Sequence, residues 1–347
     1  MKILGIETSC DETAVAVYDS SEQQLKSSVL FSQIALHEKY GGVVPEIASR
    51  SHLEKIGPLV RQALEQAGVT IDDIGAIAVT NKPGLAGALL VGLCFAKGLS
   101  WANDKKLIGV DHLQAHVFSS FLLSDGSIRG DLAFPHISLV ASGGHTSLFL
   151  VKDFGEFELI GQTLDDAVGE ALDKVAKLIG LGYPGGPIIE KLAMEAKFQD
   201  FYSYPRTKNL RKTLDFSFSG LKTAVLYDLV KRGAYDLSVG IIANKVTPEL
   251  QQQVASSLLV CVGEIMQAKV ALAFKKYPEA KGFTFTGGVA CNAYLREQLK
   301  KTCIKYDKQF VAPPVKFCGD NAAMVAFVGA DKAKKGKFSD FGLEVLI

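Results

Sequence analysis

Two segments of the chain follow the same plan, and this internal repeat constrains the fold more than any other feature. Residues 2–18 read as an apolar strand, a polar turn and a second strand, and residues 137–152, "ISLVASGGHTSLFLVK", repeat that order. When the two segments are aligned, Ser9 falls on Ser142. Self-similarity at a fixed spacing is the sequence signature of a duplicated structural unit.

A second pair of segments extends the duplication. "IGAIAVTNKPGLAGALLVGLCFAKGL" and "GFTFTGGVACNAYLREQLKK" both read as a strand, a glycine turn and a helix, and Thr80 falls on Thr286. A long helical insertion, about residues 165–275, interrupts the second copy. The fold class predicted is therefore α/β, with two copies of one unit. Alternation of strands and helices favours mainly parallel sheets, with helices on both faces and ligands at the carboxyl ends of the strands. Apolar spacing predicts helices over residues 45–67, 112–123, 165–178, 187–196, 221–231 and 248–275.

Composition limits the classes of partner and compartment. The 347 residues carry 38 Lys and Arg against 37 Asp and Glu, so an RNA contact would need a local basic patch rather than a global field. No signal peptide or apolar stretch of membrane length is evident, and the six cysteines form no CxxC pair, which favours reduced thiols in the cytoplasm. One segment clusters basic residues near two tyrosines and reads either as an RNA contact or as a solvated loop: Arg206, Lys208, Arg211, Lys212 and Lys222, with Tyr202 and Tyr204.

Residues 111–116, Asp-His-Leu-Gln-Ala-His, hold two histidines four positions apart. On a helix such a pair faces one side, so His112 and His116 read either as metal ligands or as a buried core pair. The zinc-peptidase pattern HExxH is excluded, because Leu113 stands where that reaction needs its glutamate base. Asp320, in "PPVKFCGDNAAMVAF", is the best third ligand, although it also reads as a helix N-cap. Two imidazoles and a carboxylate suit Fe(II) or Zn(II) better than Mg(II).

Three glycine-rich turns favour a nucleotide site. "SGGHTS" (142–147), "TGGVACN" (286–292) and "GLGYPGGPIIEKL" (180–192) each read equally well as a tight structural turn, but together they predict backbone that approaches a phosphate or ribose. In the third, Glu190 is placed to accept a hydrogen bond from a sugar hydroxyl.

Taken together, these motifs resemble the universal tRNA threonylcarbamoyladenosine transferase family (bacterial TsaD type, formerly called glycoprotease), which belongs to the actin-like ATPase and sugar-kinase superfamily. The resemblance covers nearly the whole chain and rests on "GIETSCDETAVA", "GGVVPEIASRSH", "PGLAGALLVG", "DHLQAH", "SGGHT", "LDDAVGEALDKVAKLIGLGYPGGP", "FSFSGLKTAV", "TGGVACN" and "CGDNAAM". It implies two duplicated actin-like (ribonuclease H-like) domains with the helical insertion in the second. We expect residues 1–111 plus 322–347 in the first domain and residues 112–321 in the second.

The resemblance also implies roles for individual residues. One divalent metal per subunit, Fe(II) first and Zn(II) as the alternative, would be bound by His112, His116 and Asp320. The family's ligand-binding residues fall on Val140, Ala141, Ser142, Gly143, Gly144, Asp173, Gly186, Glu190 and Asn292. Glu12 is either a general base or an acid that anchors its hairpin.

The activity implied is transfer of a threonylcarbamoyl group from threonylcarbamoyl-AMP to the exocyclic amine of the adenosine 3′ of the anticodon, in tRNAs reading codons that begin with A. The partners implied are tRNA, a paralogous actin-like subunit and a small ATPase subunit, with no membrane. In the family, the region around Arg50 and His52 takes part in subunit association. The alternative is an actin-like-fold kinase or ATPase acting on a small substrate, which would need Mg(II) held by carboxylates and water. A non-enzymatic scaffold for tRNA modification is a third reading.

Overall fold

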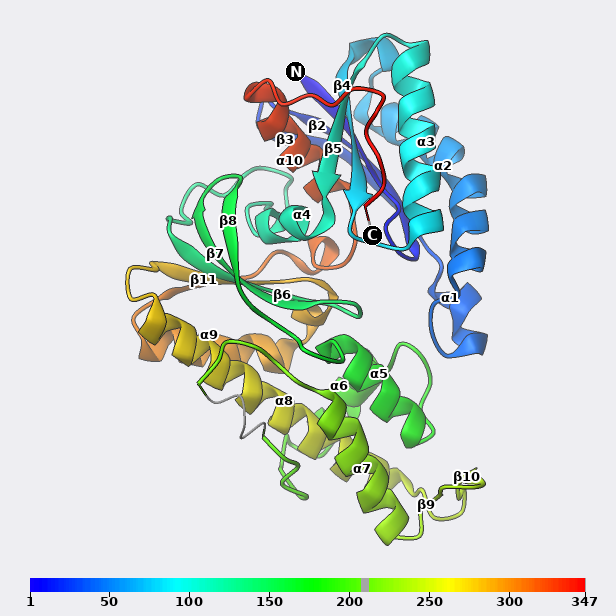
Figure 1. The fold of residues 1–347 in the computed structure, drawn as a ribbon, viewed down its shortest axis with the longest axis vertical. Helices are drawn as coiled ribbons and strands as arrows, with labels where there is room; N and C mark the ends of the chain where they lie inside the picture. Colours follow the sequence, from blue (N-terminus) through cyan, green and yellow to red (C-terminus); the bar gives the residue numbers. More distant parts are fainter. Residues whose placement is uncertain (207–211, 347) are drawn as a thin grey trace. The chain divides into compact units, whose positions relative to one another are not determined.

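The computed structural model describes residues 1–206 and 212–346 (Figure 1). The chain forms two compact units, the first from Met1–Asp131 and Pro313–Ile347 and the second from Leu132–Ala312. Residues 112–131 and 313–321, expected in the second domain, therefore lie in the first unit. Both segments that carry the expected metal ligands thus belong to one compact body.

The first unit is built on a five-stranded sheet of order β3-β2-β1-β4-β5. The strands β1, β2 and β3 form an antiparallel meander, whereas β4 and β5 extend the sheet in parallel with β1. The bounds are β1 (Lys2–Glu7), β2 (Glu12–Asp19), β3 (Gln24–Ser32), β4 (Ile74–Lys82) and β5 (Lys106–Asp111).

The second unit repeats this sheet, with order β12-β11-β6-β7-β8. The register repeats as well, because Glu7 pairs with Ala14 in the first unit and Val140, at the equivalent position, pairs with Ser147 in the second. The duplication predicted from the sequence is confirmed at the level of single residue pairs. The bounds are β6 (His136–Ala141), β7 (Thr146–Asp153), β8 (Glu156–Gln162), β11 (Gly282–Thr286) and β12 (Gln309–Val311); a small separate hairpin pairs β9 (Tyr235–Asp236) with β10 (Gly240–Ile241).

The expectation of mainly parallel sheets was wrong. In each five-stranded sheet two strand pairs are antiparallel and two are parallel. The physical reason is connection length, since the short turns after β1 and β6 can join only antiparallel neighbours. Parallel pairing begins where a helix connects the strands.

Helices cover both faces of the first sheet. Helices α2 and α3 pack on β2, β3 and β4, and α10 packs on the other face across β1, β2 and β4 (Figure 1). Gly5 permits the close approach of α10, because a Cβ there would lie 2.5 Å from the Ala322 carbonyl oxygen. The bounds are α1 (Ile34–His37), η1 (Glu38–Tyr40), α2 (Pro45–Ala67), η2 (Ile71–Asp73), α3 (Ala86–Ala102), α4 (His112–Ser119), η5 (Val315–Phe317) and α10 (Ala322–Lys334).

Alternation along β1 determines which residues meet which helices. Leu4 and Ile6 enter an apolar core with side chains of α2 such as Ile56 and Val60. Gly5 and Glu7 point to the opposite face, the one that α10 covers. The C-terminal tail packs back on the same core through Leu343 and Val345.

The helices of the second unit include the predicted insertion. They are α5 (Val168–Leu178), α6 (Gly185–Glu195), α7 (Ser219–Lys231), α8 (Pro248–Lys276), η4 (Gly288–Cys291) and α9 (Ala293–Lys305). Contrary to the sequence analysis, α8 holds an apolar stretch of membrane length, with a mean hydropathy of 1.6 over 18 residues. Of that stretch 72% is buried within the fold, as in the core helix of a globular domain.

Burial of His136 at the start of β6 predicts an acid sensitivity. Burial lowers the pKa of this imidazole to about 4, so between pH 6.5 and 4 the unfolded chain holds a proton that the folded chain does not. Stability should therefore fall as the pH falls through this range, by about 3 kcal/mol in total from this group. His136 faces Gly282 across the sheet and stacks on Phe134, so His136→Phe should fit and abolish this contribution. Urea unfolding followed by circular dichroism at pH 7 and pH 4.5 tests this prediction. An equal loss of unfolding free energy in wild type and in His136→Phe would contradict it.

Candidate metal centre

The strand β5 delivers the histidine pair directly onto a helix. Asp111 ends the strand and caps α4, its side chain accepting a hydrogen bond of 3.0 Å from the Gln114 backbone N–H. His112 and His116 then occupy successive turns on one side of α4, with ring centroids 4.6 Å apart at an interplanar angle of 86°. Both are buried, with 5% and 0% of their surface exposed. The four-residue spacing therefore places both imidazoles on the same side of α4, as predicted.

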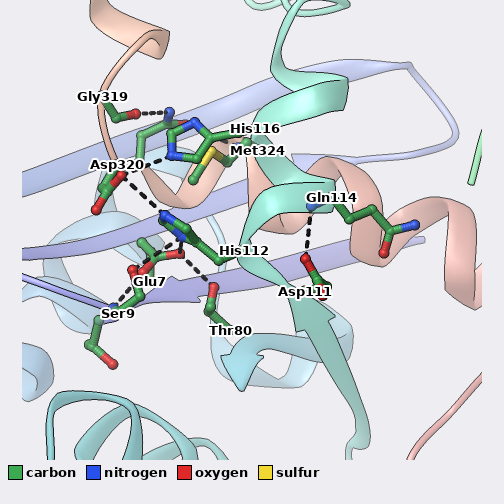
Figure 2. Close-up of polar contacts among 12 residues, drawn as sticks. Glu7, Ser9, Thr80, Asp111, His112, Gln114, His116, Gly319, Asp320 and Met324 are labelled. Carbon is green, nitrogen blue, oxygen red and sulfur yellow. Dashed lines mark hydrogen bonds and ion pairs between the residues drawn. The ribbon is translucent and has the colours of Figure 1, made fainter. Parts of the chain in front are cut away.

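Asp320 completes the cluster from a distant part of the sequence. Its Oδ1 lies 2.9 Å from Nε2 of His116 and 3.5 Å from Nε2 of His112, and Figure 2 shows the three side chains converging. The N-cap of α10 is Asn321, whose side chain accepts from the Met324 N–H at 3.1 Å. Asp320 is thus not the N-cap that the sequence also allowed, and its carboxylate is directed to the histidines.

Glu7 orients the first histidine, and sequence reasoning missed it. Its carboxylate is fully buried and lies 3.2 Å from Nδ1 of His112, while the Thr80 hydroxyl and the Ser9 N–H each donate to it at 2.5 Å (Figure 2). Because Nδ1 faces Glu7, Nε2 of His112 faces Asp320. The available signal was a charged residue at the end of the apolar strand "KILGIE".

The charges of the cluster shift one another's protonation. Burial opposes a charge on His112, but the carboxylates of Asp320 and Glu7 outweigh it and raise the pKa of His112 to about 9. Burial and the positive charge on His112 lower the pKa of His116. Burial alone would raise the pKa of Glu7, yet His112 holds it below the usual value. The cluster thus favours one positive charge between two carboxylates.

The three ligand atoms suit a metal ion. One nitrogen of each histidine and one oxygen of Asp320 all lie within 4.8 Å of one another, so the group could bind a metal. A metal-ligating histidine commonly donates its other ring N–H to a carboxylate, and Glu7 stands in that place for His112. Two imidazoles and one carboxylate also leave coordination positions open for a substrate. A cation would replace the positive charge that protonated His112 otherwise supplies.

One further acid, Glu12, adjoins the cluster. Glu12 begins β2, and its Oε1 accepts from the Ser32 hydroxyl at 3.4 Å. Burial and the negative charges of Asp320 and Asp11 raise the pKa of Glu12 well above its usual value. A divalent cation at Asp320 would offset this repulsion and favour the ionised form of Glu12.

The expected ligand loop lies in the second unit, at the end of β6. Val140 and Ala141 are buried in the sheet, and Ser142 closes the turn, its hydroxyl accepting from the His145 N–H at 3.1 Å. Gly143 and Gly144 are exposed, and a Cβ at either would meet no atom within 4 Å. This turn therefore offers open backbone that a ligand can approach closely.

The other expected ligand contacts lie around α6 and α9. Asp173 accepts from the Gly185 N–H at 2.7 Å and so holds the glycine turn that opens α6. Glu190, on α6, accepts a hydrogen bond of 2.6 Å from the Ala293 N–H at the start of α9. Asn292 caps α9 by accepting from the Leu295 N–H at 2.9 Å. These side chains already serve as caps, and Gly186, in the first turn of α6, has only Leu172 near its Cβ position, at 3.9 Å.

The structure shows ion pairs or packing contacts for part of the expected basic patch. Arg206 forms ion pairs with Asp200 and Glu264, both at 2.7 Å. The Tyr202 ring packs under Arg232 with 4.1 Å to its centroid, and Tyr204 is buried. Lys208 and Arg211 lie outside the described residues, which leaves Lys212, exposed, and Lys222, half-buried, as the described basic residues of the predicted patch.

Comparison with known proteins identifies the family. The family profile described as "TsaD: tRNA N6-adenosine threonylcarbamoyltransferase" matches residues 24–327. A protein of that name from Kosmotoga olearia is 46% identical over 340 residues, covering 98% of this chain and 96% of the relative. One from Thermosipho africanus is 44% identical and covers 100% of this chain and 98% of the relative. The chain belongs to this family.

Solved structures support the fold. The activator of the 2-hydroxyisocaproyl-CoA dehydratase from Clostridium difficile, solved with bound ADPNP, aligns with a TM-score of 0.54 at 13% identity over 97% of both chains. The architecture of two duplicated actin-like α/β domains, with a helical insertion in the second, is confirmed.

The geometry of the cluster predicts an order of metal affinities. His116→Ala or Asp320→Ala removes a ligand atom and should weaken Zn(II) binding by more than about 100-fold. Glu7→Gln keeps the shape of the side chain but removes the negative charge next to Nδ1 of His112, and should weaken Zn(II) binding by roughly 10–100-fold. Asp331→Asn, an acid of α10 that pairs with Lys335, is the matched control and should bind like wild type. Competition with a chromophoric chelator measures these affinities. Equal Zn(II) affinities in the wild type and all four variants would refute the site.

Proposed function

We propose that the chain transfers the threonylcarbamoyl group of threonylcarbamoyl-AMP to the exocyclic amine of the adenosine 3′ of the anticodon, in tRNAs that read codons beginning with A. Family membership over nearly the full length supports the reaction. The observation that carries the mechanism is the convergence of His112, His116 and Asp320, because acyl transfer to a weakly nucleophilic amine needs an electrophilic centre.

The proposed cofactor is one divalent metal, Fe(II) first and Zn(II) as the alternative, held by Nε2 of both histidines and by Asp320. When bound, such a metal supplies a Lewis acid that polarises the carbamoyl carbonyl. Glu7 keeps His112 oriented for binding. Elemental analysis of protein purified without oxygen distinguishes iron from zinc.

The proposed transfer forms a bond between the amine nitrogen and the carbamoyl carbon and breaks the bond from that carbon to the AMP phosphate oxygen. The Ser142–Gly144 turn would hold the leaving group, because its open backbone admits a phosphate closely. Asp173 and Asn292 would act by holding the turns that shape this region, since their side chains cap α6 and α9. The amine must lose a proton, and Glu12, whose ionised form a bound cation would favour, is the proposed acceptor.

The proposed partners follow from the reaction. tRNA is the acceptor, and the family resemblance adds a paralogous actin-like subunit and a small ATPase subunit. The described basic residues Lys212 and Lys222 are proposed to contact tRNA, because Arg206 is committed to Asp200 and Glu264. The cytoplasm is the proposed location, in keeping with a tRNA substrate and six cysteines without a disulfide.

The kinase alternative fits the cluster less well. Phosphoryl transfer relies on Mg(II), which prefers oxygen ligands and retained water. Two buried imidazoles are poor ligands for that ion. The relatives named above carry the transferase name at 44–46% identity, whereas the match to the nucleotide-bound activator is limited to the fold.

Reconstitution tests the transferase directly. Purified protein, partner subunits, threonylcarbamoyl-AMP and unmodified tRNA should yield threonylcarbamoyladenosine in nucleoside mass analysis. His112→Ala and His116→Ala should reduce the rate by more than about 100-fold, because each removes a proposed ligand of the metal that would polarise the carbonyl. Asp331→Asn should retain wild-type activity.

Two results would overturn the proposal. With all components verified, absence of the modified nucleoside would reject the activity itself. Undiminished modification by both histidine variants would instead assign the chain a scaffolding role and place the chemistry elsewhere.

A further inference from the structure

His52 lies inside the first unit, not on a surface that a partner could reach. It is 0% exposed in α2, although the family resemblance associates its region with subunit contacts. Its neighbour Leu53 is 70% exposed and does face outward. The buried imidazole must therefore serve the unit's own structure.

Three polar groups surround the His52 ring. Nε2 lies 2.9 Å from the Cys10 carbonyl oxygen, Nδ1 lies 2.8 Å from the Thr13 hydroxyl, and the Gln33 side-chain amide approaches Nδ1 at 3.4 Å. A carbonyl oxygen can only accept, so Nε2 carries the proton and donates it to Cys10. Nδ1 then accepts from Thr13. One neutral tautomer thus satisfies the contacts with Cys10 and Thr13, and the more distant Gln33 amide approaches the same acceptor.

These bonds hold the loop between β1 and β2, residues 8–11. The Gln33 backbone N–H donates to the Asp11 carbonyl at 3.0 Å, and the Leu85 N–H donates to the Ser9 carbonyl at 2.8 Å. At one end of the loop, the Ser9 hydroxyl lies 3.1 Å from Nδ1 of His112. At the other end stands Glu12. His52 therefore contacts the loop at Cys10, which lies in sequence between Ser9, next to the metal cluster, and Glu12, the proposed base.

We propose that His52 is a positioning residue for the transfer reaction: by holding the Cys10 carbonyl and the Thr13 hydroxyl, it keeps Ser9 against His112 and Glu12 in its place at the start of β2. This inference rests on the proposed function. His52 itself touches neither His112 nor Asp320 in any described contact, so its effect passes through the loop. Without it, the loop would keep the backbone bonds from Leu85 and Gln33 but lose its only side-chain donor to Cys10 among the described residues.

The test compares substitutions of His52 that differ in their ability to donate a hydrogen bond to the Cys10 carbonyl and to accept one from the Thr13 hydroxyl. His52→Leu fills the volume but leaves the Cys10 carbonyl and the Thr13 hydroxyl without partners. His52→Gln retains an N–H that can reach Cys10 and an oxygen that can accept from Thr13. His52→Asn is too short to span both, and replaces the leucine variant should that one fail to fold. Ile56→Val trims the same helix one turn further on, in the apolar core, where it removes no hydrogen bond, and is the matched control.

The expected result is a loss in kcat alone. With saturating tRNA and threonylcarbamoyl-AMP, His52→Leu should lower kcat about 10-fold, a factor in the range expected when buried polar groups lose their hydrogen-bond partner. The KM for tRNA and the bound metal per chain should stay at wild-type values, and His52→Gln should restore kcat to within about threefold. Ile56→Val should lower the melting temperature without changing kcat.

Hydrogen exchange supplies a readout independent of activity. Amides of residues 9–13 should exchange about 10-fold faster in His52→Leu than in wild type, and recover in His52→Gln. Unchanged exchange, or a kcat loss shared by Ile56→Val in proportion to its lost stability, would overturn the positioning role. If wild type itself modifies no tRNA, the proposed function fails, and the exchange experiment still decides whether His52 holds the loop.

Discussion

The buried carboxylate of Glu7 is the contact on which the arrangement of the first unit depends. A charge without water must be paired, and here Thr80, Ser9 and His112 supply the partners from β4, the first turn and α4. One side chain therefore ties the carboxyl ends of two parallel strands to the helix that bears the histidines. The same contact turns Nε2 of His112 toward Asp320, so stability and ligand geometry share a cause.

In the second unit, the position equivalent to Glu7 holds an apolar residue instead of an acid. Val140 occupies the position of Glu7, with the same register to the neighbouring strand, and Thr286 occupies that of Thr80. The buried Thr286 hydroxyl has no hydrogen-bond partner among the described residues, whereas Thr80 donates to Glu7. Within the described residues the first unit alone has a group of three side chains that could bind a metal. Duplication thus provided one sheet twice, with this cluster in the first copy and an open glycine turn in the second.

Sequence reasoning reached the features that local patterns encode. The repeat predicted two equivalent sheets, and the four-residue spacing of His112 and His116 predicted a common facing direction. It left alternatives open, or missed a residue, where distant contacts decide. Asp320 read as a ligand or as a helix cap, and Asn321 is the residue that caps α10. Glu7 read as the first residue of a polar turn, because nothing local reveals its contact with His112 of α4. Arg206 read as an RNA contact or as part of a solvated loop, and it pairs with Glu264, on a helix far along the chain.

Glu7 is proposed to direct His112 so that both histidines offer Nε2 to one ion beside Asp320. Anomalous diffraction from crystals grown with Zn(II) would locate that ion. We expect a single strong peak in the first unit, about 2.0–2.2 Å from Nε2 of both histidines and from an Asp320 oxygen, with Nδ1 of His112 on Glu7. A metal bound through Nδ1 of His112, or a peak away from these three side chains, would contradict it.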